Sequence, residues 1–511
     1  MKASRIMATS LVAVLIVALL AACTGVGSTP TAVATKAPAT NAATDSPTAP
    51  PAPVEKPKIT VYGPPNVEEF PAGENENNNR IINHIKELTG YDVEWVIGPR
   101  EKTREAMNLI MASGDPPDMI YSGDKATFSD YTAQQLLNPV DAYIDSAQNI
   151  KTLVPESGWV AVEYNGEHFA VPVPQNQFAS SGVIIRKDWY ETLGSPSLAT
   201  IDDYVAVLRQ VKEKKLGGDN TIAYTARFAA DDVFAYAYGL NVLYKPVDGA
   251  LIATDIQPYA KQYLEFMAKL YKDGLLDSEY AVNTAQTMEE KMVNGTAFME
   301  TNGWTAVQGL ERAAKEKNPA PAYAVIQPPK GIDGQPTYFN LNPPVRVYFM
   351  FPAESDKTKE AVAFLDRCTM DDIRVVISYG WEGEHYTKDD QGMIKQTEKA
   401  EQIRYRIYYN MWDTVGDFEN RVKLKGFATG YFPMREFTKT EYVINYAPPI
   451  ADLTEYSPAL KDLKDEYFTK IITGAWGIEK FDEYVQKWGT YGGDAVIKAI
   501  NDWYKDWPGK K

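Results

Sequence analysis

The chain has 511 residues, a formal net charge of −16, and a composition that is 44% hydrophobic and 23% charged. This length exceeds the size at which a single hydrophobic core stops growing, so the sequence predicts two lobes. The acidic balance disfavours nucleic acid as a partner, because phosphates are bound by basic surfaces. The hydrophobic content is typical of a globular protein rather than of a disordered one.

Residues 1–22 have the features of a secretory signal peptide. Lys2 and Arg5 precede an apolar run at 11–20, which is too short to span a bilayer comfortably. The run leads into Leu-Ala-Ala-Cys at 20–23, which resembles the lipobox of bacterial lipoproteins. In that class the cysteine thiol receives diacylglycerol, so the resemblance implies Cys23 as the lipidation site. The alternative is an ordinary secretory signal followed by a chance cysteine.

The segment 23–57 is predicted to be a disordered tether. After Cys23 it is dominated by Ala, Thr, Pro and Ser and contains no aromatic residue. Such a composition cannot bury a core. A lipid on Cys23 followed by this tether would hold the body of the protein at the extracellular face of the cell membrane.

The body begins with strands and helices in alternation. The apolar spacing predicts strands at 58–62, 92–97 and 118–121, with amphipathic helices at 79–88 and 103–111 between them. This order predicts a parallel sheet with right-handed crossovers, whose ligands lie beyond the carboxyl ends of the strands.

The remaining elements predict a second lobe. A strand pair at 168–173 and 182–186 is expected to cross into it, and Thr200 with Asp203 forms a capping box that opens a helix at 201–214. Further elements are a helix at 259–271, strands near 296–299, 322–327 and 345–351, and a mostly helical portion from 373 onward. The fold class is therefore α/β, with 58–178 plus 328–378 as lobe 1 and 182–326 plus 380–511 as lobe 2.

Several short motifs occur in a fixed order along the body. They are GDPPD at 114–118, YNG at 164–166, FAVP at 169–172, IRKDW at 185–189, LYKDGLL at 270–276, NGTAFM at 294–299, GWEG at 380–383, IITG at 471–474 and FDEY at 481–484. Together they resemble the family 1 extracellular solute-binding proteins, especially the large lipoproteins of Gram-positive bacteria. The resemblance implies a two-lobed periplasmic-binding-protein-like fold, with a hinge and with the ligand held between the lobes.

The same resemblance implies a function without catalysis. The expected ligand is a carbohydrate, most simply an oligosaccharide, which the protein delivers to the membrane permease of an ABC importer. The protein is expected to act as a monomer without a cofactor, and the permease and its ATPase are separate polypeptides. Some relatives carry a calcium loop after the helix that ends near 214, but 215–220 offers too few oxygen ligands for such a site.

Four residues are candidates for sugar contacts because aromatic rings bind the C–H faces of sugars and charged side chains bind their hydroxyls. Trp304 matches the position at which a tryptophan of the family stacks on sugar, although it could equally be a helix-start residue packed in the core. Trp381 and Glu382 lie in a glycine-flanked loop, which alternatively marks only a tight turn. Arg346 could reach a carboxylate or hydroxyl of the ligand, or it could pair with an acidic neighbour.

Five further candidates follow from the topology of the sheet. Tyr62, Asn66 and Glu69 lie at or after the end of the first strand, and Ser122 and Asp124 follow the third strand. The carboxyl ends of parallel strands meet at one edge, so these side chains are predicted to line the ligand site. Polar loop residues are common on any surface, which is the alternative for each of them.

Two other classes of protein remain open from the sequence. The chain has only 3 His and 2 Cys, without the spacing of a metal site and without a G-x-S-x-G or Walker A motif. No metal or cofactor is therefore predicted, Cys368 is expected to be a buried apolar residue, and the tyrosines at 405, 408 and 409 are expected in a core. An anchored glycoside hydrolase needs only two carboxylates and stays an alternative, as does a peptide-binding receptor.

Overall fold

Strands and helices follow one another in the computed structural model in the alternating order of an α/β protein. The structure describes residues 56–64, 68–227, 232–315, 321–390, 392–507 and 509. The predicted signal peptide at 1–22, nearly all of the predicted tether at 23–57, the lipidation site Cys23 and the candidate Asn66 therefore lie outside the described residues.

The first sheet has five strands in the order β2-β1-β3-β14-β6. Strand β1 pairs in parallel with β2 and β3, whereas β14 runs antiparallel to both β3 and β6. The predicted β-α-β-α-β order and its parallel pairing are confirmed. The bounds are β1 (Lys58–Gly63), β2 (Asp92–Ile97), β3 (Met119–Ser122), β6 (Val171–Pro174) and β14 (Val345–Met350).

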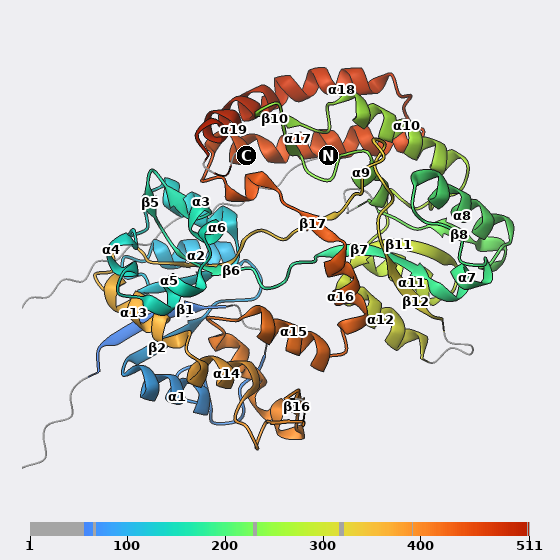
Figure 1. The fold of residues 1–511 in the computed structure, drawn as a ribbon. Helices are drawn as coiled ribbons and strands as arrows, with labels where there is room; N and C mark the ends of the chain where they lie inside the picture. Colours follow the sequence, from blue (N-terminus) through green and yellow to red (C-terminus); the bar gives the residue numbers. More distant parts are fainter. Residues whose placement is uncertain are drawn as a thin grey trace, which may run out of the picture. The chain divides into compact units, whose positions relative to one another are not determined.

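Helices cover both faces of this sheet. Helix α1 (Arg80–Thr89) buries Ile81 and Ile85 in one core, together with α13 (Thr358–Cys368) and α14 (Asp371–Tyr379). Helix α2 (Thr103–Met111) and α3 (Lys125–Ala133) pack in the core on the other face. Figure 1 shows the two layers, with α1, α13 and α14 on one side of the strands and α2, α3 and α6 on the other. We call this sheet with its helices lobe 1.

Lobe 1 also contains short helices and a hairpin between β3 and β6. Cys368 is 1% exposed within the core, as expected. The short elements are α4 (Asp141–Ile144), α5 (Gln148–Leu153), α6 (Glu156–Val160), β4 (Glu163–Tyr164) and β5 (Glu167–His168).

The second sheet has four strands in the order β12-β7-β11-β8. Helices α8 (Ile201–Glu213) and α10 (Pro258–Lys272) pack on one face, and α12 (Trp304–Ala314) with α16 (Ala428–Glu436) on the other. The predicted capping box is present, since Thr200 accepts from the Asp203 N–H and Asp203 accepts from the Thr200 N–H. The strand bounds are β7 (Ser181–Arg186), β8 (Ile222–Tyr224), β11 (Ala297–Gly303) and β12 (Tyr323–Ile326).

We call this second sheet with its helices lobe 2. Its smaller elements lie between β7 and β11 along the chain. Their bounds are α7 (Lys187–Thr192), the 3₁₀ helix η1 (Gly218–Asn220), α9 (Val233–Ala237), β9 (Tyr244–Val247), β10 (Ala250–Ala253) and α11 (Ala285–Val293).

The strands expected at 168–173 and 182–186 form as β6 and β7, and the chain crosses between the lobes there as expected. β6 and β7 lie in different sheets, one in each lobe. The residues between them carry the chain from one sheet to the other, so the two apolar runs never meet. The alternation of the sequence identified both strands but not their partners.

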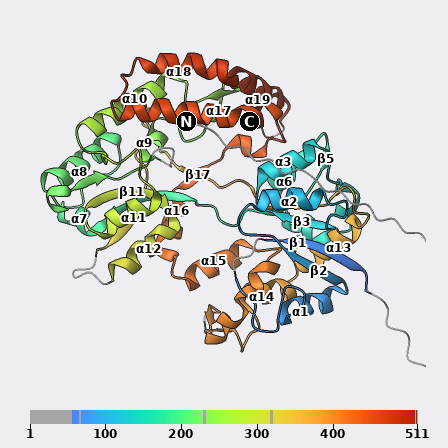
Figure 2. The same ribbon diagram turned by 180° about the vertical axis from the view of Figure 1, so that it is seen from behind.

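The C-terminal portion is helical, as predicted. Helix α17 (Ala451–Ile472), α18 (Lys480–Trp488) and α19 (Asp494–Asp506) place Phe468, Tyr484 and Ile500 in the core that contains α10. Figures 1 and 2 show α17 and α18 lying along α10 from both sides of the molecule. A π-helical turn, η4 (Gly489–Gly493), joins α18 to α19.

One segment packs differently from the predicted division of the lobes. The 3₁₀ helix η2 (Glu398–Tyr409) and the residues up to Trp412 belong to the core of lobe 1, not to that of lobe 2. Tyr409 is fully buried, and its ring centroid lies 5.1 Å from that of Trp95 on β2. The expectation that the tyrosines at 405, 408 and 409 lie in a core is confirmed.

The remaining elements lie between η2 and α17 or in short ribbons. Within the described residues, no helix is both long and apolar enough to cross a membrane. The bounds are β13 (Phe339–Asn340), β15 (Tyr386–Lys388), β16 (Ile394–Gln396), α15 (Val415–Leu424), β17 (Thr438–Thr440) and the 3₁₀ helix η3 (Val443–Tyr446).

Tyr409→Ala tests whether the segment 398–412 is part of the lobe 1 core. We expect it to lower the free energy of unfolding by about 3–5 kcal/mol, because a large buried ring is replaced by a cavity. Tyr491→Ala is the control, since Tyr491 is 49% exposed. Urea unfolding of both variants gives the comparison, and equal losses would contradict the assignment of this segment.

Candidate ligand-binding cleft

Three stretches of the described chain connect the two cores. The first lies between Val173 and Ala179, the second between Phe339 and Val345, and the third between Trp412 and Val422. The first two lie side by side and are hydrogen-bonded. The Gln175 N–H donates to Pro344 O at 2.8 Å, and Asn342 Nδ2 donates to Gln177 O at 2.7 Å.

A buried polar group ties the third connection to the first. Asn176 Nδ2 donates to Asp413 Oδ2 at 2.7 Å, and Arg421 Nη1 donates to Asp413 Oδ1 at 2.8 Å. Asn176 is 2% exposed and Asp413 is 5% exposed. Burial lowers the pKa of the Arg421 guanidinium, but the Asp413 carboxylate outweighs this effect and raises it. Polar contacts rather than a shared apolar core therefore join the lobes here.

A cavity lies against these connections and is lined from both lobes. Its volume is about 190 Å³, which is below the roughly 300–1,000 Å³ of typical ligand pockets. The lobes at their present spacing leave room for only part of a ligand. The lining that can contact a sugar consists of Gln175, Phe178, Asn342, Tyr442 and Tyr446.

Lys125 makes a direct contact between the lobes. Its Nζ, on the first turn of α3 in lobe 1, donates to Ile444 O at 3.1 Å and to Asn445 O at 2.9 Å. Ile444 packs in the core of lobe 2. Burial lowers the pKa of the Lys125 ammonium to about 8.

Arg346 is the predicted site residue with the clearest unmet bonding capacity. Its Nε and Nη2 are buried and have no hydrogen-bond partner among the described residues. The expected alternative, a pair with an acidic neighbour, is therefore not seen there. Because Tyr348 is opposite Ser122, Arg346 lies beyond the carboxyl end of β3, beside Gly123.

Three of the predicted contacts at the strand ends have structural roles. Tyr62 is 2% exposed and packs in the lobe 1 core. Asp124 caps α3, where it accepts from the N–H groups of Ala126 at 3.0 Å and Thr127 at 3.2 Å. Ser122 is 3% exposed and accepts from the Asp124 N–H at 3.1 Å.

Trp304 begins a helix and packs against other side chains, which was the alternative to a sugar contact. It is the first residue of α12, half-buried, and its ring makes edge contacts with three aromatic rings of α15 and α16 and the turn between them. These partners are Phe418, Phe427 and Tyr431.

Trp381 and Glu382 are also engaged by neighbouring side chains. The Arg80 guanidinium lies 3.7 Å from the centroid of the Trp381 ring and covers one of its faces. Glu382 is exposed and pairs with Lys388 at 2.9 Å. Glu69 is exposed and lines a groove of about 1000 Å³ that Arg80 also lines.

The family model for "bacterial extracellular solute-binding protein" matches residues 79–369, more than half of the 511. The chain belongs to this family. Solute-binding proteins are receptors rather than enzymes, so the glycoside hydrolase alternative is not supported.

Relatives and solved structures extend the similarity beyond the matched range. The polygalacturonan/rhamnogalacturonan-binding protein YtcQ of Bacillus subtilis is 24% identical over 84% of this chain and 88% of its own length. Lipoprotein LipO of the same organism is 22% identical over 82% and 88%. A solute-binding protein from Bifidobacterium longum infantis, described as binding HMO, superposes with a TM-score of 0.70 at 15% identity, over 88% of this chain and 98% of that one. This last similarity confirms the periplasmic-binding-protein-like fold.

Several residues of this solute-binding protein's cleft were not predicted. Asn176, Asp413 and Arg421 come from distant segments, and their sequence contexts carry no signal. One feature of the sequence could have pointed to Lys125. A cation in the first turn of a helix opposes the helix dipole, which suggests that its charge is used elsewhere.

A carboxyl group with a strongly raised pKa is buried on β11 in lobe 2. Glu300 on β11 is 0% exposed, and neither carboxyl oxygen has a hydrogen-bond partner among the described residues. Burial, aided by the Glu289 carboxylate, raises the pKa of Glu300 to about 8. The side chain is therefore held as a neutral acid inside lobe 2.

The stability of the protein should depend on pH through Glu300. The folded pKa of about 8 exceeds the ordinary 4.5, so the folded state retains a proton that the unfolded state releases between these values. Stability should fall as pH rises through this window. Glu300→Gln should remove this slope and stabilise the protein at pH 7 by on the order of 3 kcal/mol.

Denaturant unfolding at several pH values between 5 and 8 checks this prediction. Glu290→Gln, on the exposed face of α11, is the matched control and should keep the slope. A Glu300→Gln variant whose stability follows the same pH profile as the wild type would contradict it.

Proposed function

We propose that this solute-binding protein captures an oligosaccharide between its lobes and delivers it, chemically unchanged, to the permease of an ABC importer. Family membership supports the receptor role. The names of similar proteins support the ligand class, since they include a polygalacturonan/rhamnogalacturonan-binding protein, an alginate-binding protein and a protein in complex with kestose.

The proposed place of binding rests on the environment of Arg346. Leaving the buried Nε and Nη2 of this half-buried side chain without partners is costly, and a ligand that supplies oxygen acceptors removes that cost. Arg346 lies at the carboxyl edge of the lobe 1 sheet, where ligands of open α/β sheets bind. A sugar hydroxyl or uronate carboxylate has the oxygens that it needs.

The cavity against the connections offers the complementary contacts. Phe178, Tyr442 and Tyr446 present aromatic rings for C–H faces of a sugar, and Gln175 and Asn342 present amides for its hydroxyls. We propose that an oligosaccharide contacts these groups together with Arg346, and that the lobes close around it. Glu69, Trp304, Trp381 and Glu382 remain candidates for secondary contacts.

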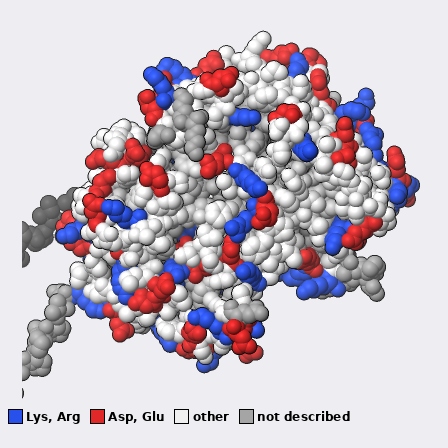
Figure 3. All heavy atoms as spheres, viewed as in Figure 1, with Lys and Arg blue, Asp and Glu red and all other residues white. Residues whose placement is uncertain are grey.

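We further propose that the protein is anchored to the extracellular face of the membrane by a lipid on Cys23. The lipobox-like sequence supports this, and the relative LipO is named a lipoprotein. The body is proposed to act as a monomer, with the permease as its membrane partner. Acidic and basic side chains are interspersed over the face in Figure 3, without the continuous basic surface that nucleic acid would need.

Arg346→Gln tests the proposed place of binding. A thermal-shift screen over oligogalacturonides, milk oligosaccharides, fructans, maltodextrins and short peptides first identifies a ligand. Calorimetric titration should then show about 10- to 100-fold weaker binding to Arg346→Gln, the range for losing a charge-assisted hydrogen bond.

Arg209→Gln is the control because Arg209 pairs with Asp273 on the surface of lobe 2. Equal affinities of the two variants would contradict the role of Arg346. A response to peptides with none to any saccharide would contradict the carbohydrate proposal itself.

A further inference from the structure

A second cavity lies entirely within lobe 2. Its volume is about 330 Å³, and it lies among α9, α10, α17 and α18. It shares no lining residue with the cavity between the lobes. Its volume is within the range of ligand pockets and corresponds to about ten water molecules.

Six of the seventeen residues that line this cavity, which we call the lobe 2 cavity, are aromatic. Each of them is at most 6% exposed, although the cavity lies beside them. They are Tyr236, Tyr244, Tyr263, Tyr280, Phe468 and Trp488.

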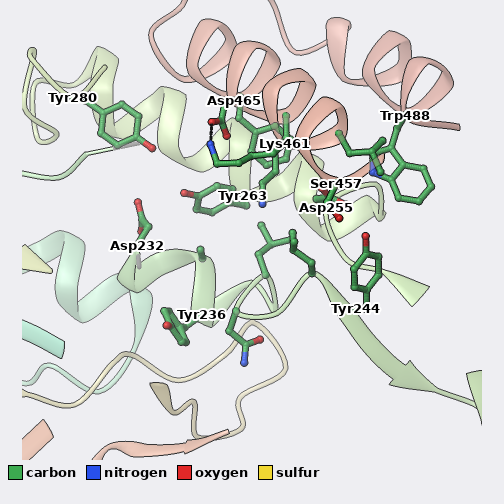
Figure 4. A pocket seen from close by; sticks show the side chains of 17 residues that line it. Asp232, Tyr236, Tyr244, Asp255, Tyr263, Tyr280, Ser457, Lys461, Asp465 and Trp488 are labelled. Atoms are coloured by element: carbon green, nitrogen blue, oxygen red, sulfur yellow. Dashed lines mark hydrogen bonds and ion pairs between the residues drawn. The ribbon is translucent and has the colours of Figure 1, made fainter. Parts of the chain in front are cut away.

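Asp232 supplies an unused acceptor in this wall. It is 5% exposed, and its Oδ1 accepts the Phe234 N–H at 2.8 Å as the cap of α9. Its Oδ2 is buried and has no hydrogen-bond partner among the described residues. In Figure 4 the Asp232 carboxyl group and the hydroxyls of Tyr263 and Tyr280 point toward one another. Burial raises the pKa of Asp232 to about 6.

The other charged groups in the lining have both signs. Asp255 accepts the Tyr484 hydroxyl at 2.8 Å. Lys461 pairs with Asp465 on α17, and Lys464 also lines the cavity. Lys461 is 65% exposed and Asp465 is 28% exposed, so this pair lies where the cavity meets solvent. The lining contains both acids and lysines, so it matches neither a simple cation nor a simple anion.

We propose that the lobe 2 cavity is a second binding site, for one neutral polyhydroxylated ring of monosaccharide size. Aromatic faces bind the C–H surface of such a ring, while carboxylates, tyrosine hydroxyls and lysines bind its hydroxyls. We expect Asp232 Oδ2 to accept a ring hydroxyl of this ligand. The site is complete within lobe 2, so it does not depend on the proposed cleft or on closure of the lobes.

Asp232→Asn is the decisive variant because asparagine also caps helices, so α9 keeps its cap while the carboxylate is lost. Saturation-transfer NMR and calorimetry with galactose, glucose, mannose, rhamnose and xylose measure binding to the full chain. We expect one of these sugars to bind the wild type and to bind Asp232→Asn at least about tenfold more weakly. Tyr263→Phe, which removes one hydroxyl only, should weaken binding in the same direction.

The controls separate this site from the proposed cleft. Asp462→Asn removes an exposed acid from α17 and should leave monosaccharide binding unchanged. Arg346→Gln should also leave it unchanged. The proposal is overturned if none of the five sugars binds at millimolar concentration. It is equally overturned if binding is lost in Arg346→Gln and retained in Asp232→Asn, since the sugar would then occupy the cleft.

Discussion

The two sheets do not share a hydrophobic core, and this constraint governs the rest of the molecule. β6 buries Val171 and Val173 in lobe 1, β7 buries Val183 and Ile185 in lobe 2, and the residues between them are largely polar. The contacts described across the seam are polar. They are hydrogen bonds, each with a net worth of about 1 kcal/mol, and the ion pair between Arg421 and Asp413. The lobes can therefore change their relative position without exposing either core, which is what a receptor that closes around its ligand requires.

Because the two cores are separate, the ligand would supply most of the contacts that the proposed closed state has and the open state lacks. A ligand shifts an open–closed equilibrium only by the contacts that it makes in one state and not in the other. In the proposed binding mode, Arg346 on lobe 1 and Tyr442 on lobe 2 contact the ligand from opposite sides. Lys125 joins the lobes through the carbonyl groups of Ile444 and Asn445. The lobe 2 cavity is different, because its walls belong to one rigid core.

The elements could be predicted from the sequence far better than their partners. Apolar spacing located β1, α1, β2, α2 and β3 within a few residues, since each element buries one periodic face. It could not show that Tyr409 packs against Trp95, because apolar spacing identifies a buried face but not the core in which that face is buried. The site residues show the same limit. The sequence around Asp124 is equally typical of a helix cap and of a ligand contact. The rings that contact Trp304 come from segments more than 100 residues away in the sequence. Cys23 and Asn66 stay predictions.

The central claim is that the lobes move relative to each other when an oligosaccharide binds, and a distance measured between them tests it most directly. Leu109 on α2 and Val282 in lobe 2 are 74% and 76% exposed, whereas Cys368 is 1% exposed. Spin labels at Leu109→Cys and Val282→Cys, in a Cys23→Ser background, report the distance by pulsed electron resonance. The account predicts that a saturating oligosaccharide shifts the distance distribution and is recovered intact. An unchanged distribution at saturation would contradict it.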